Sequence, residues 1–351
     1  MNYIDGSYGE GGGQVLRTSL SIAAITGEPI RLEGIRAGRP KPGLAAQHLT
    51  AARAAAALCQ AEVRGDALGS MTLEFIPSSS AQAGRYIFDV TQAREGGSAG
   101  AVMLVLQTIL LPLALASGES DVTLRGGTHV TYSPTVTYIE QVYLPVVQQM
   151  GVEAEVKLNA WGWYPKGGGE VELRTSGGSK LNGINLLKRG DLSHVQGLAV
   201  VTELPSHIPQ RMASRAENLL HQANLKATVK PLRERGVAPG AGIFLTAEYQ
   251  HSRIGFSALG RVGLPAEKVA EMACEELLNF HQTGAPVDEH LADQLLLPAA
   301  LASQESYYRV AEVTTHLTTN AWVIEQFGLA RVTIDEEEKV VTVKPSTINQ
   351  T

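Results

Sequence analysis

The residue in this sequence whose type and surroundings best suit covalent chemistry is His316. It lies among four threonines and an asparagine in residues 313–320, just before an apolar helical pattern. Thr319 or Asn320 can cap that helix, which would leave His316 in the turn before it, where catalytic side chains are often found. Neutral imidazole is a good nucleophile at physiological pH. A lone histidine beside a strand is more often structural, so a functional interpretation needs support from elsewhere in the chain.

A glycine-rich segment near the N-terminus could bind phosphate. Residues 6–14 read Gly-Ser-Tyr-Gly-Glu-Gly-Gly-Gly-Gln and lead from a short predicted strand into a helical pattern. Such a turn presents free backbone N–H groups and the positive end of the helix dipole. The spacing matches neither a Walker A loop nor GxGxxG. Glu10 would repel phosphate unless a divalent cation lay between them, so the segment predicts either a metal-assisted phosphate site or a flexible surface turn.

A basic loop follows the strand predicted at residues 30–35. It places Arg36, Arg39 and Lys41 among prolines and glycines, and residues 34–53 contain no acidic side chain. Gln47 and His48 follow at the start of an alanine-rich helical pattern. Cations on a rigid loop favour a phosphate-rich ligand. The alternative is a solvated loop before a helix.

Composition restricts the class of protein. The chain has 351 residues, 44% of them hydrophobic and 18% charged, and a net charge of −6, so nucleic-acid contact would need a local basic patch. No secretory signal is visible, and both cysteines lie in apolar helical patterns typical of buried thiols in a reducing compartment. The apolar run at residues 98–117 contains Gln107 and Pro112, which favours a buried helix over a membrane span. We therefore predict a cytoplasmic protein with no membrane contact.

Internal repetition predicts the elements that position these residues. Residues 110–120 match residues 296–306 at nine of eleven positions, and each copy precedes a strand leading to a Thr-His pair, at His129 and at His316. A looser copy covers residues 20–32. Three related helix–strand units imply an α/β (α+β) domain of repeated modules. The site is expected where their glycine-rich and histidine-bearing turns meet.

A segment without the repeat pattern separates the second and third units. After a Ser-Gly-Gly-Ser segment at residues 176–179, the patterns predict strands at 194–201, 226–231, 242–249 and 253–259, with helices at 211–223 and 265–280. We predict a large domain made of residues 1–182 and 285–351, and a smaller inserted α/β domain at residues 183–284.

The order of these motifs resembles the RNA 3′-terminal phosphate cyclase family. The motifs spread over most of the chain: residues 9–14 with Arg17, residues 36–44 with Gln47 and His48, and residues 97–100, 126–128, 164–169, 291–294 and 316–320. The resemblance implies a large domain of three repeats, each of two helices on a four-stranded sheet, with a smaller α/β domain inserted late.

The resemblance also implies a three-step reaction that consumes ATP. A histidine, here His316, attacks the α-phosphorus of ATP, releases pyrophosphate and keeps AMP. The AMP passes to the terminal 3′-phosphate of an RNA. The neighbouring 2′-hydroxyl then attacks that phosphorus, expels AMP and leaves a 2′,3′-cyclic phosphate, a ring closure favoured by intramolecularity.

The same resemblance implies roles for the other candidates. Glu10 would bind Mg²⁺ or Mn²⁺ between phosphates, and Asp293 would contact the ribose or orient His316. At His290 the family has a tyrosine that stacks on adenine, and an imidazole stacks with less area. The remaining ATP-binding and phosphate-binding candidates are Gln14, Arg17, Arg36, Arg39, Gln47, His48, Gln107, Pro134 and Gln294.

Two other functions compete with a cyclase. One is a non-catalytic relative that acts in ribosome assembly as a scaffold for RNA or protein; such relatives lack the histidine, whereas this chain has His316, Glu10 and the basic loop. The other is a repeat-built transferase of the enolpyruvyl type, which would leave residues 316–320 unexplained. The predicted partners are ATP and an RNA with a 3′-terminal phosphate, with a homodimer as a further prediction.

Overall fold

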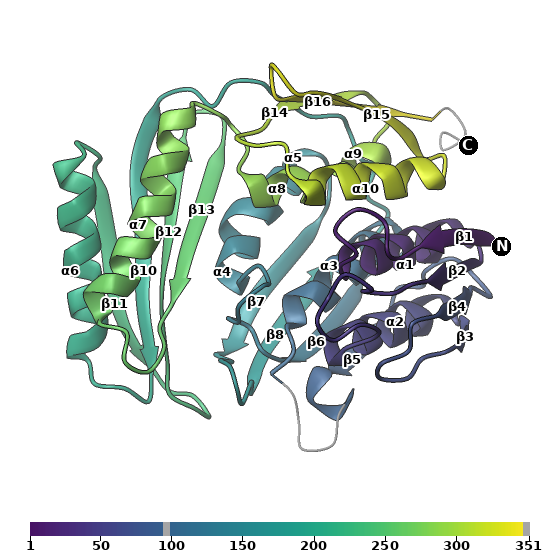
Figure 1. The fold of residues 1–351 in the computed structure, drawn as a ribbon, viewed down its shortest axis with the longest axis horizontal. Coiled ribbons are helices and arrows are strands. Elements are labelled where there is room, and N and C mark those ends of the chain that lie inside the picture. Colours follow the sequence, from purple (N-terminus) through teal and green to yellow (C-terminus); the bar gives the residue numbers. More distant parts are fainter. Residues whose placement is uncertain (94–98, 347–351) are drawn as a thin grey trace.

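The fold consists of four four-stranded sheets with helices packed on them, shown in Figure 1. The computed structural model describes residues 1–93 and 99–346. Three of the sheets share one topology, in which the first strand pairs in parallel with the second, and the fourth lies antiparallel between the second and the third. The predicted α/β fold of three repeated modules is confirmed.

The first unit begins the chain and carries the glycine-rich and basic loops. The helix that follows the glycine-rich loop stops at Gly27, whose left-handed backbone (φ 74°) donates its N–H to the carbonyl of Ala23. The elements are β1 (Asn2–Asp5), α1 (Gln14–Thr26), β2 (Ile30–Glu33), α2 (Ala46–Cys59), β3 (Glu62–Arg64) and β4 (Leu73–Ile76).

The second unit repeats this order around the most apolar helix of the chain. That helix, α3, is almost entirely buried even though it contains Pro112. The unit comprises β5 (Arg85–Asp89), the 3₁₀ turn η1 (Val90–Ala93), α3 (Val102–Leu115), β6 (Ser120–Gly126), α4 (Val136–Tyr138), the π-helical turn η2 (Ile139–Tyr143), α5 (Leu144–Gln149), β7 (Ala154–Ala160) and β8 (Gly169–Thr175).

The third unit is split by the inserted segment. Its first strand, β9, pairs in parallel with β14, although more than a hundred residues separate them in the sequence. The unit comprises β9 (Asn185–Leu186), α8 (Glu289–Gln294), α9 (Leu296–Ala300), β14 (Ser306–Arg309), α10 (Thr315–Gln326), β15 (Ala330–Asp335) and β16 (Val340–Pro345).

The inserted segment forms the fourth sheet, with a different strand order, β11-β10-β12-β13. Its helices α6 and α7 cover one face of that sheet, on the left in Figure 1. The elements are β10 (Leu192–Thr202), α6 (His207–Gln222), β11 (Ala227–Glu234), β12 (Gly240–Tyr249), β13 (Arg253–Leu259) and α7 (Ala266–Thr283). The predicted domain boundaries stay a prediction, and because β9 belongs to the third sheet we propose that the insertion begins after Leu186.

Side chains alternate between the two faces of the inserted sheet, as strand geometry requires. Ile243 and Leu245 of β12 face α6 and α7, whereas Phe244 between them packs with Trp163 of the second unit. The insertion is therefore anchored to the second unit by the second face of its sheet.

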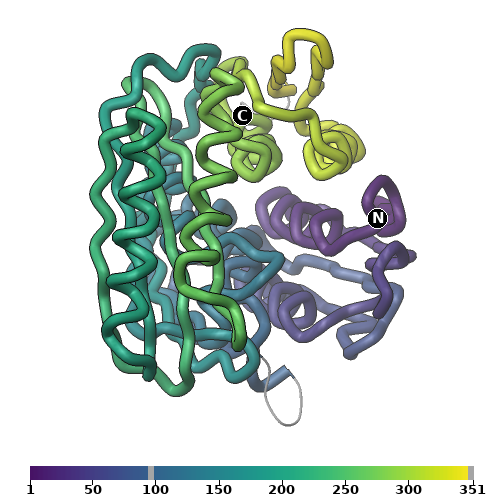
Figure 2. The backbone as a smooth tube through the Cα atoms, turned by 60° about the vertical axis from the view of Figure 1, so that its left-hand side comes forward, coloured from purple at the N-terminus to yellow at the C-terminus, as the bar shows by residue number. Residues whose placement is uncertain are grey.

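A single core joins the three repeated units. Helices α1, α2 and α3 contact one another in the middle of this part, α10 packs against α1, and the sheets lie outside them (Figures 1 and 2). The glycine-rich loop of the first unit thereby comes beside α10 of the third. Both cysteines, Cys59 and Cys274, are buried free thiols, as predicted.

Candidate functional site

His316 occupies the first turn of α10, not the loop before it. Thr314 is the N-cap, since its hydroxyl accepts a hydrogen bond from the backbone N–H of Leu317 at 3.2 Å. The helix therefore begins five to six residues earlier than a cap at Thr319 or Asn320 would place it, and that prediction was wrong. Both of those residues are buried on the inner side of the helix. Half of the His316 side chain is exposed, so a ligand can reach it.

The glycine-rich loop packs too closely on its neighbours to hold larger residues. A Cβ on Gly9, which has φ +62°, would lie 2.1 Å from the hydroxyl oxygen of Thr319 in α10. A Cβ on Gly13 would lie 2.1 Å from Nε2 of His48 in α2. Absence of side chains at these two positions lets the loop lie between α10 and α2. The alternative of a loose surface turn does not fit these contacts.

His316 contacts two polar residues of this loop, Glu10 in its middle and Gln14 at its end. Its Nδ1 lies 2.7 Å from Oε1 of Gln14, the first residue of α1. Its Nε2 lies 2.8 Å from Oε2 of Glu10, whose other oxygen pairs with Arg39 of the basic loop. Residues from three predicted motifs thus meet at one imidazole.

A hydrogen-bond network supports these residues from behind. The amide nitrogen of Gln14 donates to the carboxylate of Asp293 in α8. Asn320 donates to the backbone carbonyl of Asp293 at 2.8 Å and accepts from the hydroxyl of Thr18 at 2.7 Å. The network connects α1, α8 and α10, so the position of the imidazole is tied to three helices.

Burial shapes the electrostatics of this cluster. Burial lowers the pKa of Arg17 to about 10, against the opposing effect of Asp293, and it raises the pKa of Asp293 to about 7. Burial also lowers the pKa of His316, helped by the positive charges of Arg17 and Arg39. A lowered pKa keeps the imidazole neutral near pH 7, the form that can act as a nucleophile.

The basic loop surrounds a buried imidazole. Burial, together with Arg17, Arg36 and Arg39, holds the pKa of His48 well below its ordinary value. Arg36 has left-handed backbone (φ 54°) and donates to the carbonyl of Gly43 at 2.7 Å, which closes the loop. Nδ1 of His48 is buried without a hydrogen-bond partner. Three cations and an unsatisfied ring nitrogen form an environment suited to an anionic ligand.

The donor set of Glu10 fits a divalent cation shared with a ligand. Its Oε2 is buried and has no hydrogen-bond partner, because the contact with His316 lacks hydrogen-bond alignment. Within the described residues, no three acidic, histidine or cysteine side chains are grouped so as to hold a metal. Glu10 could therefore supply one hard oxygen ligand, with the others coming from phosphate and water, which is the mode that Mg²⁺ favours.

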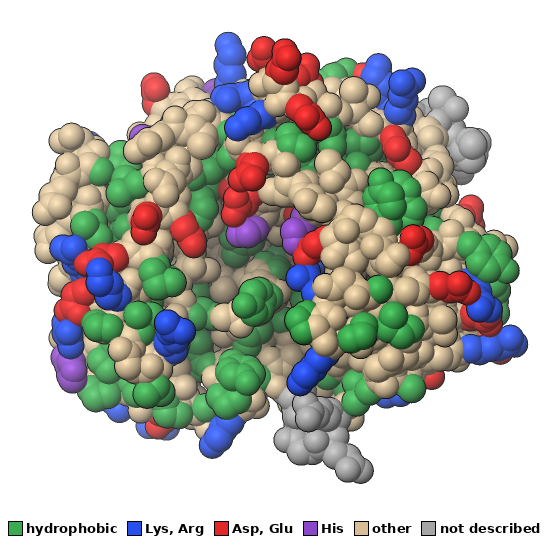
Figure 3. Space-filling model, viewed as in Figure 1, with side chains coloured by type: hydrophobic (Ala, Val, Ile, Leu, Met, Phe, Trp, Pro, Cys, Tyr) green, Lys and Arg blue, Asp and Glu red, His purple; other side chains and the backbone are tan. Residues whose placement is uncertain are grey.

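The other predicted site residues are linked to this cluster less closely. His290 in α8 is about two-thirds exposed, and its charge contributes to the lowered pKa of His316. Gln294, also in α8, has a buried Oε1 without a hydrogen-bond partner. Among the described residues, no hydrogen bond or ion pair links the cluster to Gln47, Gln107 or Pro134. Figure 3 shows histidines and basic side chains along a hollow in the middle of the molecule.

The second Thr-His pair of the repeats does not join the site. His129 is buried and stacks on Trp161 with ring centroids 4.4 Å apart, beside Phe244 of the insertion. Burial lowers its pKa to about 3, so it is neutral. The expectation that both histidine-bearing turns meet at one site is therefore wrong. Of the sequence motif at residues 97–100, residues 97 and 98 lie outside the described residues.

Sequence reasoning missed Thr18, Thr314 and Asp288. Thr18 lies one helical turn after Gln14, a spacing that could have shown their common face. Asp288 is fully buried and caps α8 by accepting from the backbone N–H of His290 and Leu291.

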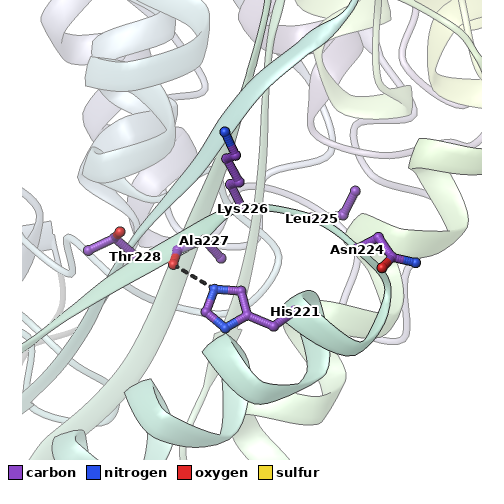
Figure 4. Close-up of a pocket in the computed structure, with 6 residues that line it drawn as sticks. All are labelled: His221, Asn224, Leu225, Lys226, Ala227 and Thr228. Carbon is purple, nitrogen blue, oxygen red and sulfur yellow. Dashed lines mark hydrogen bonds between the residues drawn. The ribbon is translucent and has the colours of Figure 1, made fainter.

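A separate cavity of about 310 Å³ lies in the insertion, where α6 leads into β11 (Figure 4). Nε2 of His221 points toward the carbonyl oxygen of Ala227 at 3.2 Å. None of the predicted site residues lines this cavity. The lining residues are His221, Asn224, Leu225, Lys226, Ala227 and Thr228.

Fold and site together define a class of protein: a repeat-built α/β protein with a neutral histidine between a glycine-rich loop and a cationic loop. Comparison with known families supports this. A model described as RNA 3′-terminal phosphate cyclase matches residues 8–334. The chain belongs to the RNA 3′-terminal phosphate cyclase family, and the prediction from the sequence motifs is confirmed.

Individual relatives cover the whole length. The RNA 3′-terminal phosphate cyclase of Nostoc punctiforme is 73% identical over 347 residues, covering 99% of this chain and 100% of that protein. The one from Archaeoglobus fulgidus is 40% identical, covering 97% and 99%. The enolpyruvyl transferase NikO from Streptomyces tendae matches at 14% identity and a TM-score of 0.26, covering 50% of this chain and 33% of that one, which carries no argument for a transferase.

Proposed function

We propose that this protein is an enzyme that converts the 3′-terminal phosphate of an RNA into a 2′,3′-cyclic phosphodiester in an ATP-dependent reaction, with His316 as the nucleophile. The observation that carries the proposal is the placement of His316: half-exposed, held at Nδ1 by Gln14, and facing with Nε2 the carboxylate of Glu10, which also pairs with Arg39. Family membership and full-length identity to proteins named for this activity support it.

The residue types suit each step. Neutral Nε2 of His316 attacks the α-phosphorus of ATP and pyrophosphate leaves with the electron pair of the broken P–O bond. The resulting phosphoramidate transfers AMP to an oxygen of the RNA 3′-phosphate and regenerates the imidazole. The adjacent 2′-hydroxyl then attacks the activated phosphorus, and AMP leaves as the ring closes.

The basic loop and the glycine-rich loop are proposed to neutralise the negative charge of the phosphates. Arg17, Arg36 and Arg39 are proposed to contact phosphate oxygens, since these cations lie around the glycine-rich loop and already influence His48. Glu10 would hold Mg²⁺ or Mn²⁺, which when bound offsets negative charge on the triphosphate. The proposed nucleotide contacts are Gln47, His48, Gln107, Pro134, His290, Asp293 and Gln294.

The remaining predictions concern the setting of the enzyme. None of the helices in residues 1–93 and 99–346 is both long and apolar enough to cross a bilayer. We keep a cytoplasmic location and a homodimer as proposals. A non-catalytic scaffold is the competing function, and it is disfavoured because His316, Glu10 and the basic loop occur together at one site.

Incubation of the pure protein with α-labelled ATP and Mg²⁺, followed by denaturing electrophoresis, tests the proposal. We expect label on the wild type that is lost in acid and stable in alkali, as a histidine–AMP bond requires, and none on His316→Ala. Conversion of a 3′-phosphorylated RNA should be lost in the same variant. A folded wild type that takes up no label would favour the scaffold.

A further inference from the structure

Gln14 is the residue through which the buried carboxylate of Asp293 reaches the imidazole of His316. Its side chain is 5% exposed and bridges the two groups, with Oε1 2.7 Å from His316 Nδ1 and its amide nitrogen donating to Asp293. The sequence motifs suggested only that Gln14 binds ATP or phosphate. The structure gives it two partners within the protein instead.

The chemistry of these partners determines which ring nitrogen carries a proton. Above the pKa of Asp293, about 7, its carboxylate is ionised and only accepts hydrogen bonds, so the amide NH₂ of Gln14 then faces Asp293 and its carbonyl oxygen faces His316. A carbonyl oxygen also only accepts, so Nδ1 of His316 is the N–H donor. The lone pair of the neutral ring is then on Nε2, the nitrogen that faces Glu10.

The bridge is rigid because every member is fixed elsewhere. Gln14 starts α1 next to Gly13, whose missing side chain makes room for His48. Asp293 is held through its backbone carbonyl by Asn320, only four residues after His316 in α10. The carboxylate, the amide and the imidazole are therefore set by three packed helices and not by flexible loops.

We propose that Gln14 is a positioning residue that fixes the Nδ1–H tautomer of His316 and aims Nε2 at the phosphorus; this rests on the function proposed above. In the adenylation step, Nε2 forms the N–P bond while pyrophosphate departs with the electrons of the P–O bond. The Nδ1 proton stays on the ring, because the neutral amide of Gln14 is too weak a base to remove it. The adduct keeps a positive ring, which makes AMP a better group to transfer.

Nitrogen NMR of the histidine rings tests the tautomer without any turnover. Because Glu10 also contacts Nε2, the measurement compares Glu10→Ala with the double variant Glu10→Ala/Gln14→Leu at alkaline pH, where the rings are neutral. We expect His316 to be Nδ1-protonated in the first and to shift toward the Nε2–H form in the second. An Nε2–H ring, or an unchanged ring in the double variant, would overturn the proposal.

Single-turnover labelling by ATP supplies the second readout. Gln14→Leu should slow adenylation about 10–100-fold, the usual loss when a residue that orients a reactive histidine is removed, while ATP affinity from equilibrium binding stays close to wild type.

The control is Gln222→Leu, at the exposed end of α6, which should match the wild type in both measurements. Wild-type adenylation by Gln14→Leu would overturn the positioning role. Weaker ATP binding by Gln14→Leu at an unchanged adenylation rate would instead show that Gln14 contacts the nucleotide. If the wild type takes no label at all while the ring is Nδ1-protonated, the proposed function fails but the tautomer assignment stands.

Discussion

Glu10 stands between two positively charged or chargeable groups, Arg39 and His316. In the described structure it therefore covers Nε2, the nitrogen that must attack. One buried oxygen of this carboxylate has no hydrogen-bond partner, which is costly unless a ligand satisfies it. A cation that draws Glu10 toward the phosphates would both satisfy this oxygen and expose Nε2 of His316.

Replacing Glu10 by alanine should weaken metal-dependent adenylation. We expect roughly a 10–100-fold lower rate at limiting Mg²⁺, partly restored by excess Mg²⁺, since the remaining ligands would come from phosphate and water. Titration of labelling against Mg²⁺ measures this, with Glu28→Ala, an exposed residue before β2, as the control. Unchanged activity at limiting Mg²⁺ would remove Glu10 from the site.

At the scale of elements, the start of α10 decides where the nucleophile lies. The hydroxyl of Thr314 satisfies a backbone N–H of the first turn, and His316 is the second residue of that helix. The side chain thus belongs to a capped helix that also carries Thr319 and Asn320 toward the glycine-rich loop and α8. A change that loosens the cap should therefore also loosen the position of the His316 imidazole.

Thr314→Ala should destabilise the protein by about 1 kcal/mol through the lost cap and also reduce the adenylation rate. Urea unfolding midpoints and single-turnover labelling measure the two effects. Thr318→Ala is a matched control, because its hydroxyl only bonds to the carbonyl of Thr315 on an exposed surface. Equal losses in the two variants would show that the cap has no special role.

At the scale of the whole molecule, one buried contact joins the second and third units beneath the site. The hydroxyl of Tyr138 in α4 lies 2.9 Å and 3.0 Å from the two carboxylate oxygens of Asp288 and donates to them. Asp288 caps α8, the helix that carries Asp293. Burial raises the pKa of Asp288, and the Tyr138 hydroxyl opposes that increase.

Tyr138→Phe should cost about 1–3 kcal/mol, since it leaves a buried carboxylate short of a donor. The variant should raise the pKa of Asp288 further in the folded state. A raised folded pKa gives stability at low pH that is lost as pH rises through it, so the deficit should be larger at about pH 8 than at about pH 5.

Urea midpoints at the two pH values measure this, with Tyr132→Phe, a fully exposed tyrosine, as the control. A deficit that grows on acidification would contradict the assigned sign. No deficit at either pH would mean that the contact between the units contributes nothing to stability.

Much of this protein could be predicted from the sequence. The similarity of residues 110–120 and 296–306 indicated repeated units, and those segments do occupy equivalent places, each running from the helix that precedes the second strand of its unit into that strand. The grouping of Glu10, Arg39 and His316 followed from motifs with residue types suited to phosphate chemistry. Local spacing and residue type carry such information because they depend on near neighbours along the chain.

Only the tertiary structure decided the rest. The tautomer-setting role of Gln14 depends on contacts with His316 and Asp293, 302 and 279 residues away in the sequence. His129 and His316 follow the same repeat pattern, yet His129 is buried against the inserted sheet while His316 is half-exposed, because the insertion covers the second unit's turn. Capping by Thr314 rather than Thr319 likewise depended on packing, since Thr319 is buried against the glycine-rich loop and Asn320 bonds to α1 and α8. Residue types determine what chemistry is available, and long-range packing determines which residue performs it.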